Sequence, residues 1–396
     1  MKTTNCTRRR QSGGDANNSE SVNDHNTDTM NDGNQHWYGE AFAALHNHGE
    51  PAEPIHFPAS VAETAEHLVE TLTLRPHNQY VMACLKASGL LLAFLYFMLP
   101  LLIRFNPWVM RELTFLNRVS WPPFIDLNNP CDLGLEGTRS FRLDMTSDIS
   151  LGVWHVLPSD EATTATGDNA DTFTRLLSGS HKVILYLHGN AGSRAGWHRV
   201  QLYKVLAALG YHVIAFDYRG YGDSSGTPSE DGVCEDSVSV YKWLRQQGVS
   251  DIYIWGHSLG SGIAVKVTKI LCEMSIPPKG LILESAFSNV IDAVYSYPFA
   301  RPFVMMPWFS WAIVESIKQN NISFSSDTSI SSIPIPILML HAKDDRTVPY
   351  VLGQKLYAVA QLTERKTRIK FVTFEENHGY GHKHIHKAPE LPHVLR

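Results

Sequence analysis

Residues 251–271 have the sequence DIYIWGHSLGSGIAVKVTKIL. The first five, an aspartate followed by four apolar residues, predict a buried strand, and the last eleven predict a helix. Between them, Gly256-His257-Ser258-Leu259-Gly260 matches the GxSxG pattern, in which small residues let the chain turn sharply and present a serine hydroxyl above a sheet. GxSxG alone recurs by chance, but the strand before it and the helix after it make this a nucleophile elbow. We predict Ser258 as the nucleophile.

The elbow lies within a longer alternation of strands and helices. Helical stretches near 196–209 and 231–247 lie between the first three predicted strands. Strands that alternate with helices of this length predict an α/β fold, with a mostly parallel central sheet and helices on both faces. The predicted strands are residues 182–188, 211–217, 251–256, 280–284, 335–341 and 369–374.

A serine hydroxyl is a weak nucleophile, so it needs a histidine to take its proton and an acid to orient that histidine. Asp345 is our predicted acid, because it follows the strand 335–341 in the loop AKDDRTVP and has the Asp-x-x-Val-Pro spacing. The neighbouring Asp344 is the alternative. Its other roles would be a solvated loop charge or a turn cap.

The loop after strand 369–374 supplies candidates for the base. His378 and His382 both lie on this loop, and local spacing does not choose between them. Alternating histidines at 382, 384 and 386 also suggest a metal site, but no carboxylate or cysteine accompanies them at ligand spacing. We therefore predict neither a metal nor a cofactor.

The tetrahedral intermediate of acyl transfer requires preformed donors for its oxyanion. The sequence HGNAG, residues 188–192, follows the first strong strand. We predict that the backbone N–H groups of Asn190 and Leu259 form the oxyanion hole. The glycine-rich loop 217–226 lacks the GxGxxG register of a dinucleotide site, and we expect it to brace the floor of the active site.

Composition excludes some partners. The formal charge is −5 and the pI is near 6.4, so no basic face is predicted that could neutralise a run of phosphates. Nucleic acid is therefore not an expected partner. The five cysteines show no CxxC spacing, which argues against a zinc knuckle and against a dense disulfide framework.

The N-terminal third differs from the rest. Residues 1–80 begin with a polar stretch that lacks apolar periodicity, and we predict a disordered tail. Residues 81–104 contain the uncharged run 87–103, whose length suits a single transmembrane helix and which lies too far from the N-terminus for a cleaved signal peptide. Flanking charges do not determine its orientation. We assign 105–150 to a juxtamembrane segment and 151–396 to the catalytic domain.

The segment 286–332 within that domain is rich in aromatic side chains. It follows a strand on the catalytic side of the sheet, and we predict a lid over an apolar acyl-chain pocket. Ordinary helical packing would account for part of this composition. Together with the upstream anchor, the lid suggests an amphiphilic lipid ester as substrate.

These motifs resemble one known family, the α/β-hydrolase domain-containing protein 12 group, described as lysophosphatidylserine lipases and monoacylglycerol lipases. The resemblance runs from Leu151 to Leu395, and the polar tail has no counterpart in it. The matching stretches are GVWH, ILYLHGNAG, YKVLAALGYHVIAFDYRGYGDS, YIWGHSLG, LILES and APELP.

The resemblance implies an α/β-hydrolase fold, hydrolysis of lysophosphatidylserine and related glycerol esters, and an endoplasmic reticulum membrane protein with a lumenal catalytic domain. It also implies the triad Ser258, Asp345 and His382, because Gly379 to Lys383 matches the family's Gly-Tyr-x-His-Lys. The sequon at Asn321 is consistent with a lumenal domain. A membrane-tethered peptidase or thioesterase, or a catalytically silent scaffold, remain the alternatives. The sequence makes no prediction of oligomeric state.

Overall fold

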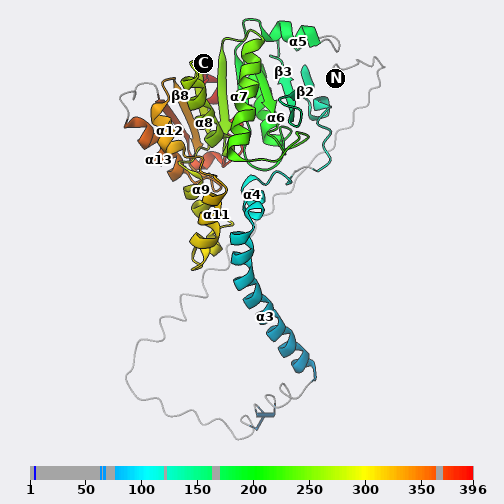
Figure 1. Ribbon diagram of the computed structural model, residues 1–396, viewed down its shortest axis with the longest axis vertical. Helices are drawn as coiled ribbons and strands as arrows, with labels where there is room; N and C mark the ends of the chain where they lie inside the picture. Colours follow the sequence, from blue (N-terminus) through cyan, green and yellow to red (C-terminus); the bar gives the residue numbers. More distant parts are fainter. Residues whose placement is uncertain are drawn as a thin grey trace, which may run out of the picture. The chain divides into compact units, whose positions relative to one another are not determined.

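The central sheet organises the chain (Figure 1). The computed structural model describes residues 4–5, 63–64, 66–67, 76–119, 123–162, 170–362 and 369–395. Within these ranges the strands are β1 (Thr4–Asn5), β2 (Thr138–Asp144), β3 (Ser150–Val156), β4 (Val183–Leu187), β5 (His212–Phe216), β6 (Ile252–His257), β7 (Gly280–Glu284), β8 (Ile337–Ala342) and β9 (Ile369–Phe374).

The described strands lie in the order β1-β2-β3-β5-β4-β6-β7-β8-β9. From β5 to β9 all neighbours pair in parallel, whereas β1, β2 and β3 join the edge in antiparallel register. The six strands predicted from the sequence correspond to β4–β9. The α/β-hydrolase fold with a mostly parallel sheet is confirmed.

The antiparallel edge extends the sheet further toward the N-terminus than we expected. β2 lies in the segment predicted as juxtamembrane, and β1 lies in the predicted tail. In β2 the buried positions include Thr138 and Ser140, which are polar. A strand that buries polar side chains has no apolar run in its sequence, so hydrophobic periodicity did not detect it.

Both faces of the parallel region are covered. In β4, Val183, Leu185 and Leu187 pack into one hydrophobic cluster, with side chains of α7 and α8. The alternate residues Ile184 and Tyr186 pack into a second cluster on the opposite face, with α6. Successive side chains of a strand point to opposite faces, so a strand covered twice is apolar throughout.

Helices cover the sheet and connect its strands (Figure 1). The longer ones after β3 are α5 (Ala170–Leu177), α6 (Trp197–Ala208), α7 (Glu230–Gln246), α8 (Leu259–Glu273) and α13 (Tyr350–Gln361). The segment 286–332 carries α9 (Val290–Ser296), α10 (Arg301–Val304), the π-helix η2 (Ser310–Val314), α11 (Glu315–Gln319), α12 (Ser326–Ser329) and the 3-10 helix η3 (Ile330–Ser332). The other short helices are η1 (Pro130–Leu133), η5 (Glu376–His378), η6 (Ile385–Lys387) and α14 (Leu391–Val394).

Two helices precede the sheet domain, α3 (Pro76–Phe105) and α4 (Pro107–Phe115). Within α3, Asn78–Phe105 is long and apolar enough to cross a membrane, and its apolar window is 11% buried. This span includes the predicted 81–104. Most of the predicted tail, 1–80, lies outside the described residues.

Candidate active site

The turn from β6 to α8 holds Ser258 in an unusual backbone conformation, with φ 54° and ψ −120°. A positive φ is strained for a residue with a side chain, and it occurs at nucleophile elbows. The two glycines of the motif are required sterically. A Cβ at Gly260 would lie 2.0 Å from the carbonyl oxygen of Leu187, and one at Gly256 would lie 2.3 Å from that of Gly260.

Ser258 opens onto a cavity of about 690 Å³. The serine itself is 9% exposed, and its backbone N–H donates to the carbonyl oxygen of Glu284 at 3.0 Å. The lining combines the elbow with two other loops. It consists of Val119, Gly189, Asn190, Ala191, Gly192, Gly196, Trp197, His198, Arg199, His257, Ser258, His382, Lys383 and His384.

His382 shares this cavity with Ser258 and binds a buried carboxylate behind it. Its Nδ1 lies 2.7 Å from Oδ2 of Asp345. The other oxygen, Oδ1, accepts from the backbone N–H groups of Thr347 and Val348, both at 2.9 Å. Burial alone would raise the pKa of Asp345, but the charge and hydrogen bond of His382 outweigh it and help to lower this pKa to about 2. Asp345 is therefore ionised at neutral pH.

Asp344 and His378, the alternative acid and base, make other contacts. Both carboxylate oxygens of Asp344 accept from the backbone N–H of Gly381 at 2.9 Å, so Asp344 fixes the loop that carries His382. His378 is exposed and stacks on Tyr380, with ring centroids 5.2 Å apart.

The remaining histidines of the loop pack on an aromatic side chain. The rings of His384 and His386 lie 6.0 and 5.8 Å from that of Trp197. Among the described residues no group of three or more His, Cys, Asp or Glu side chains could hold a metal ion.

The loop after β4 approaches the elbow closely enough to require glycine. A Cβ at Gly189 would lie 2.9 Å from Nδ1 of the buried His257 and 3.1 Å from the Cβ of Ser258. In the described part of the chain, the backbone N–H groups of Asn190 and Leu259 have no hydrogen-bond acceptor. The side chain of Asn190 is fixed, because its Nδ2 donates to the carbonyl oxygen of Thr114 at 2.6 Å. Free donors in a cavity can bind an oxyanion.

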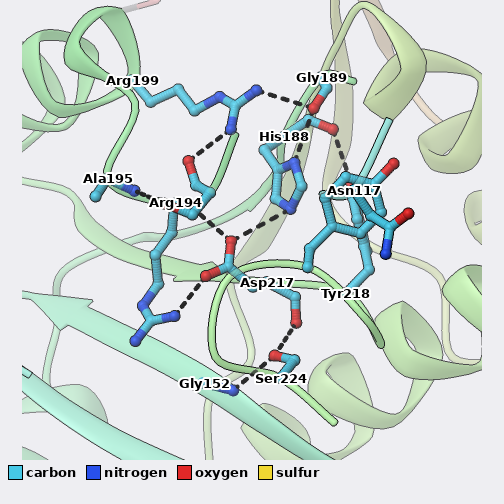
Figure 2. Close-up of polar contacts among 12 residues, drawn as sticks. Asn117, Gly152, His188, Gly189, Arg194, Ala195, Arg199, Asp217, Tyr218 and Ser224 are labelled. Atoms are coloured by element: carbon cyan, nitrogen blue, oxygen red, sulfur yellow. Dashed lines mark hydrogen bonds and ion pairs between the residues drawn. The ribbon is translucent and has the colours of Figure 1, made fainter. Parts of the chain in front are cut away.

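A buried arginine that the sequence did not single out holds this loop in shape (Figure 2). Nη2 of Arg199 donates to the carbonyl oxygens of Gly189 and Ala191, both at 2.9 Å, and Nη1 donates to that of Ser193. Arg199 is 3% exposed, and no described carboxylate pairs with it. A buried cation without a counter-ion is costly, which suggests a functional role.

The glycine-rich loop after β5 braces the same region, as the sequence predicted (Figure 2). Asp217 accepts from the backbone N–H and Nη1 of Arg194, at 2.6 and 2.5 Å. The hydroxyl of Tyr218 donates to the carbonyl oxygen of His188 at 3.0 Å. Ser224 Oγ donates to the carbonyl oxygen of Asp217 at 2.7 Å.

Two further buried groups surround the elbow. Nε2 of His257 lies 2.9 Å from the carbonyl oxygen of His382, and burial followed by the nearby His382 ring lowers the pKa of His257. Glu284 accepts from Trp255 Nε1 at 2.9 Å. Burial, assisted by the charge of Asp345, raises the pKa of Glu284 to about 7 despite that bond. His257 fills a variable position of the GxSxG motif and Glu284 ends a predicted strand, so the sequence pattern did not assign a role to either side chain.

These groups form a coherent set: a serine on an elbow, an imidazole bonded to an ionised carboxylate, and free backbone donors beside them. Fold and site together define the class of α/β hydrolases that act through a serine. Residues 182–269 match the family model described as alpha/beta hydrolase fold. This region contains the loop after β4 and the turn from β6 to α8.

Relatives define the family more narrowly. Lysophosphatidylserine lipase ABHD12 of Macaca fascicularis is 46% identical over 305 residues, covering 76% of this chain and 77% of that protein. The protein of the same name from Danio rerio is 44% identical over 304 residues, covering 76% and 80%. The chain belongs to this family of hydrolases.

Solved structures support the fold. The crystal structure of an alpha-beta hydrolase from Vibrio vulnificus superimposes with a TM-score of 0.54 at 20% identity, covering 74% of this chain and 92% of that one. At this identity the similarity extends to the fold alone.

Proposed function

We propose that this chain is a membrane-anchored lipase that hydrolyses lysophosphatidylserine and monoacylglycerol esters through Ser258, His382 and Asp345. One observation carries the proposal. His382 binds the buried Asp345 at 2.7 Å and shares one cavity with Ser258. This is the arrangement that a serine hydrolase needs to make its hydroxyl nucleophilic.

The proposed reaction is acyl transfer in two halves. Oγ of Ser258 attacks the ester carbonyl while Nε2 of His382 takes the hydroxyl proton, and Asp345 stabilises the resulting imidazolium. The oxyanion accepts hydrogen bonds from the backbone N–H groups of Asn190 and Leu259. His382 then protonates the leaving glycerol oxygen. Water, deprotonated by the same imidazole, releases the fatty acid and restores Ser258.

The charge of the cavity supports an anionic substrate. Lys383 lines it and is exposed, Arg199 lies beneath, and no carboxylate is among its described lining residues. A phosphoserine head group carries net negative charge, so Lys383 suits it as an electrostatic partner. The names of the relatives point to the same substrate class.

We further propose that α3 anchors the chain in the endoplasmic reticulum membrane with the catalytic domain in the lumen. Cys131 is disulfide-bonded, which suits an oxidising compartment. Asn321, in the sequon Asn321-Ile322-Ser323, is exposed and accessible to glycosylation.

Labelling with a fluorophosphonate probe tests the nucleophile. We expect the full chain in membranes to be labelled and Ser258→Ala to lose the label. Ser261→Ala is the matched control, because Ser261 is the neighbouring hydroxyl and donates to the carbonyl oxygen of Ser258 at 2.6 Å. This control should still react. An unlabelled parent chain would support the silent scaffold, and labelling without lipid hydrolysis would support the peptidase or thioesterase.

A further inference from the structure

The segment 286–332 has an apolar end that lies outside the active-site cavity. We call residues 297–311 the insertion tip, and Arg301 is its one charged residue. Phe299 is 78% exposed and Met305 is 89% exposed. Large side chains exposed together on a soluble surface are unusual and mark a contact site.

The base of the same segment is firmly attached to the domain. The buried carboxylate of Glu230, on α7, accepts from the backbone N–H groups of Ser323 and Phe324. Phe324 is 1% exposed and packs in the main hydrophobic cluster of the domain. The exposure of the tip is therefore not a consequence of a loosely packed segment.

The tip packs against the C-terminal end of α3 (Figure 1). The rings of Trp308 and Tyr96 lie 6.2 Å apart, and those of Trp311 and Phe105 lie 6.1 Å apart. The guanidinium of Arg104 lies 5.8 Å from the ring centroid of Trp311. The exposed apolar surface of the tip is thus continuous with that of the helix.

The position of Arg104 in α3 indicates how deep in a membrane these contacts would lie. Arg104 ends the uncharged run 87–103, so it marks the expected edge of the hydrocarbon layer. Tyr96 precedes Arg104 by eight residues, which is about 12 Å at 1.5 Å per residue. Half of a hydrocarbon core is about 15 Å thick. Trp308, beside Tyr96, therefore lies level with the acyl chains of one leaflet.

We propose that the insertion tip is buried in the lipid bilayer, in the leaflet next to the catalytic domain, as a second membrane contact beside α3. This inference rests on the proposed anchoring of α3. Phe299 and Met305 contact acyl chains, while Arg301 extends its guanidinium toward the head groups. The domain is thereby held against the leaflet in which its lipid esters reside.

Photo-cross-linking in vesicles tests the contact directly. The full chain carries p-benzoylphenylalanine at one of three positions, in phosphatidylcholine vesicles whose acyl chains bear an alkyne. Phe94, in α3, reports on the anchor, Phe299 reports on the tip, and the exposed Leu362 after α13 is the control. We expect lipid adducts at Phe94 and Phe299 and none at Leu362.

The outcomes separate the two proposals. An adduct at Phe94 without one at Phe299 overturns the buried tip and leaves the anchor in place. Absence of an adduct at both positions overturns the tip and the anchor together. Equal adducts at Phe299 and Leu362 show unspecific lipid contact and also overturn the proposal.

A second measurement tests the consequence for turnover. In the double variant Phe299→Asp/Met305→Asp, hydrolysis of lysophosphatidylserine in vesicles should fall about tenfold, because carboxylates oppose insertion. Hydrolysis of a water-soluble short-chain ester should stay unchanged, and so should both activities of the control Leu362→Asp. An equal loss with both esters would indicate misfolding or a direct effect on the site and contradict the proposal.

Discussion

The loops around Ser258 differ from the insertion tip in the contacts that their residues make. In the loops, backbone and side-chain polar groups bind one another, as in the contacts of Arg199 with Gly189 and of Asp344 with Gly381. In the tip, Phe299 and Met305 have large exposed surfaces. The loops are held by hydrogen bonds within the protein, whereas the tip exposes side chains that are suited to an apolar environment.

The difference separates two kinds of effect. A change in the loops should alter turnover of soluble and membrane-borne esters alike, since it changes the reacting groups or their support. A change in the tip should affect only substrates in a membrane. Parallel assays with a soluble ester and a vesicle-borne lipid therefore distinguish the two kinds of effect.

The largest effect is expected at Asp345. In Asp345→Asn the new amide would donate to Nδ1 of His382 and fix the tautomer that cannot accept the serine proton, so kcat should fall about 10⁴-fold with both esters. Asp344→Asn is the matched control, because its amide oxygen can still accept from Gly381 N–H. We expect it to lose less than about tenfold. A larger loss of kcat in Asp344→Asn than in Asp345→Asn would make Asp344 the acid of the triad.

Arg199→Met should have the next largest effect. It removes the donors that hold the carbonyls of Gly189, Ala191 and Ser193, so the loop after β4, which carries the proposed oxyanion donor Asn190, loses its shape. We expect kcat to fall about 10²-fold with both esters and KM to change little. Unchanged kcat in a variant of lower thermal stability would reduce Arg199 to a structural role.

Glu284 provides a test through stability. Its pKa is raised by burial from 4.5 to about 7 in the folded chain. The stability that the protonated carboxyl contributes to the fold is therefore fully present below pH 4.5 and is lost as pH rises through 7. This corresponds to about 3 kcal/mol. In Glu284→Gln that loss should disappear, as measured by thermal unfolding of the solubilised full chain near pH 5 and near pH 8.

Glu273→Gln is the control for this measurement, because Glu273 is exposed at the end of α8. It should retain the loss of stability shown by the parent chain. The same loss in Glu284→Gln would mean that another group is responsible.

The smallest effect is expected at Lys383. In Lys383→Gln, KM for lysophosphatidylserine should rise about threefold, the size of an exposed charge interaction, while KM for monoacylglycerol stays constant. Lys387→Gln is the matched control. Lys387 is also exposed on this loop, but its Nζ lies over the ring of Trp197, 5.8 Å from the centroid, and it does not line the cavity. An equal change with both substrates would exclude recognition of the head group by Lys383.

The sequence predicted the parts of the molecule that depend on local geometry. Gly256 and Gly260 are dictated by contacts within the elbow, so the motif and its flanking periodicity were sufficient. Asp345 was predicted from its Asp-x-x-Val-Pro spacing, and this short-range pattern corresponds to the hydrogen bonds that its carboxylate accepts from the N–H groups of Thr347 and Val348. The parallel strands were found because residues buried on both faces form apolar runs.

The parts that depend on distant contacts were not predictable from the residues alone. Choosing His382 over His378 required the family resemblance, because the loop that carries it is positioned from another strand by Asp344. Arg199 looks like a surface residue of an amphipathic helix, and its buried position emerges only when the loop folds over it. The aromatic composition of 286–332 suggested a lid and did not distinguish its buried base from its exposed tip.

The most direct test of the central claim is the release of fatty acid by membranes that contain the full chain. Lysophosphatidylserine and monoacylglycerol are supplied in parallel, with Ser258→Ala as the control. The account predicts release from both esters that disappears in the variant. Release that persists in Ser258→Ala, or no release from either ester while the parent chain still reacts with a fluorophosphonate, would contradict it.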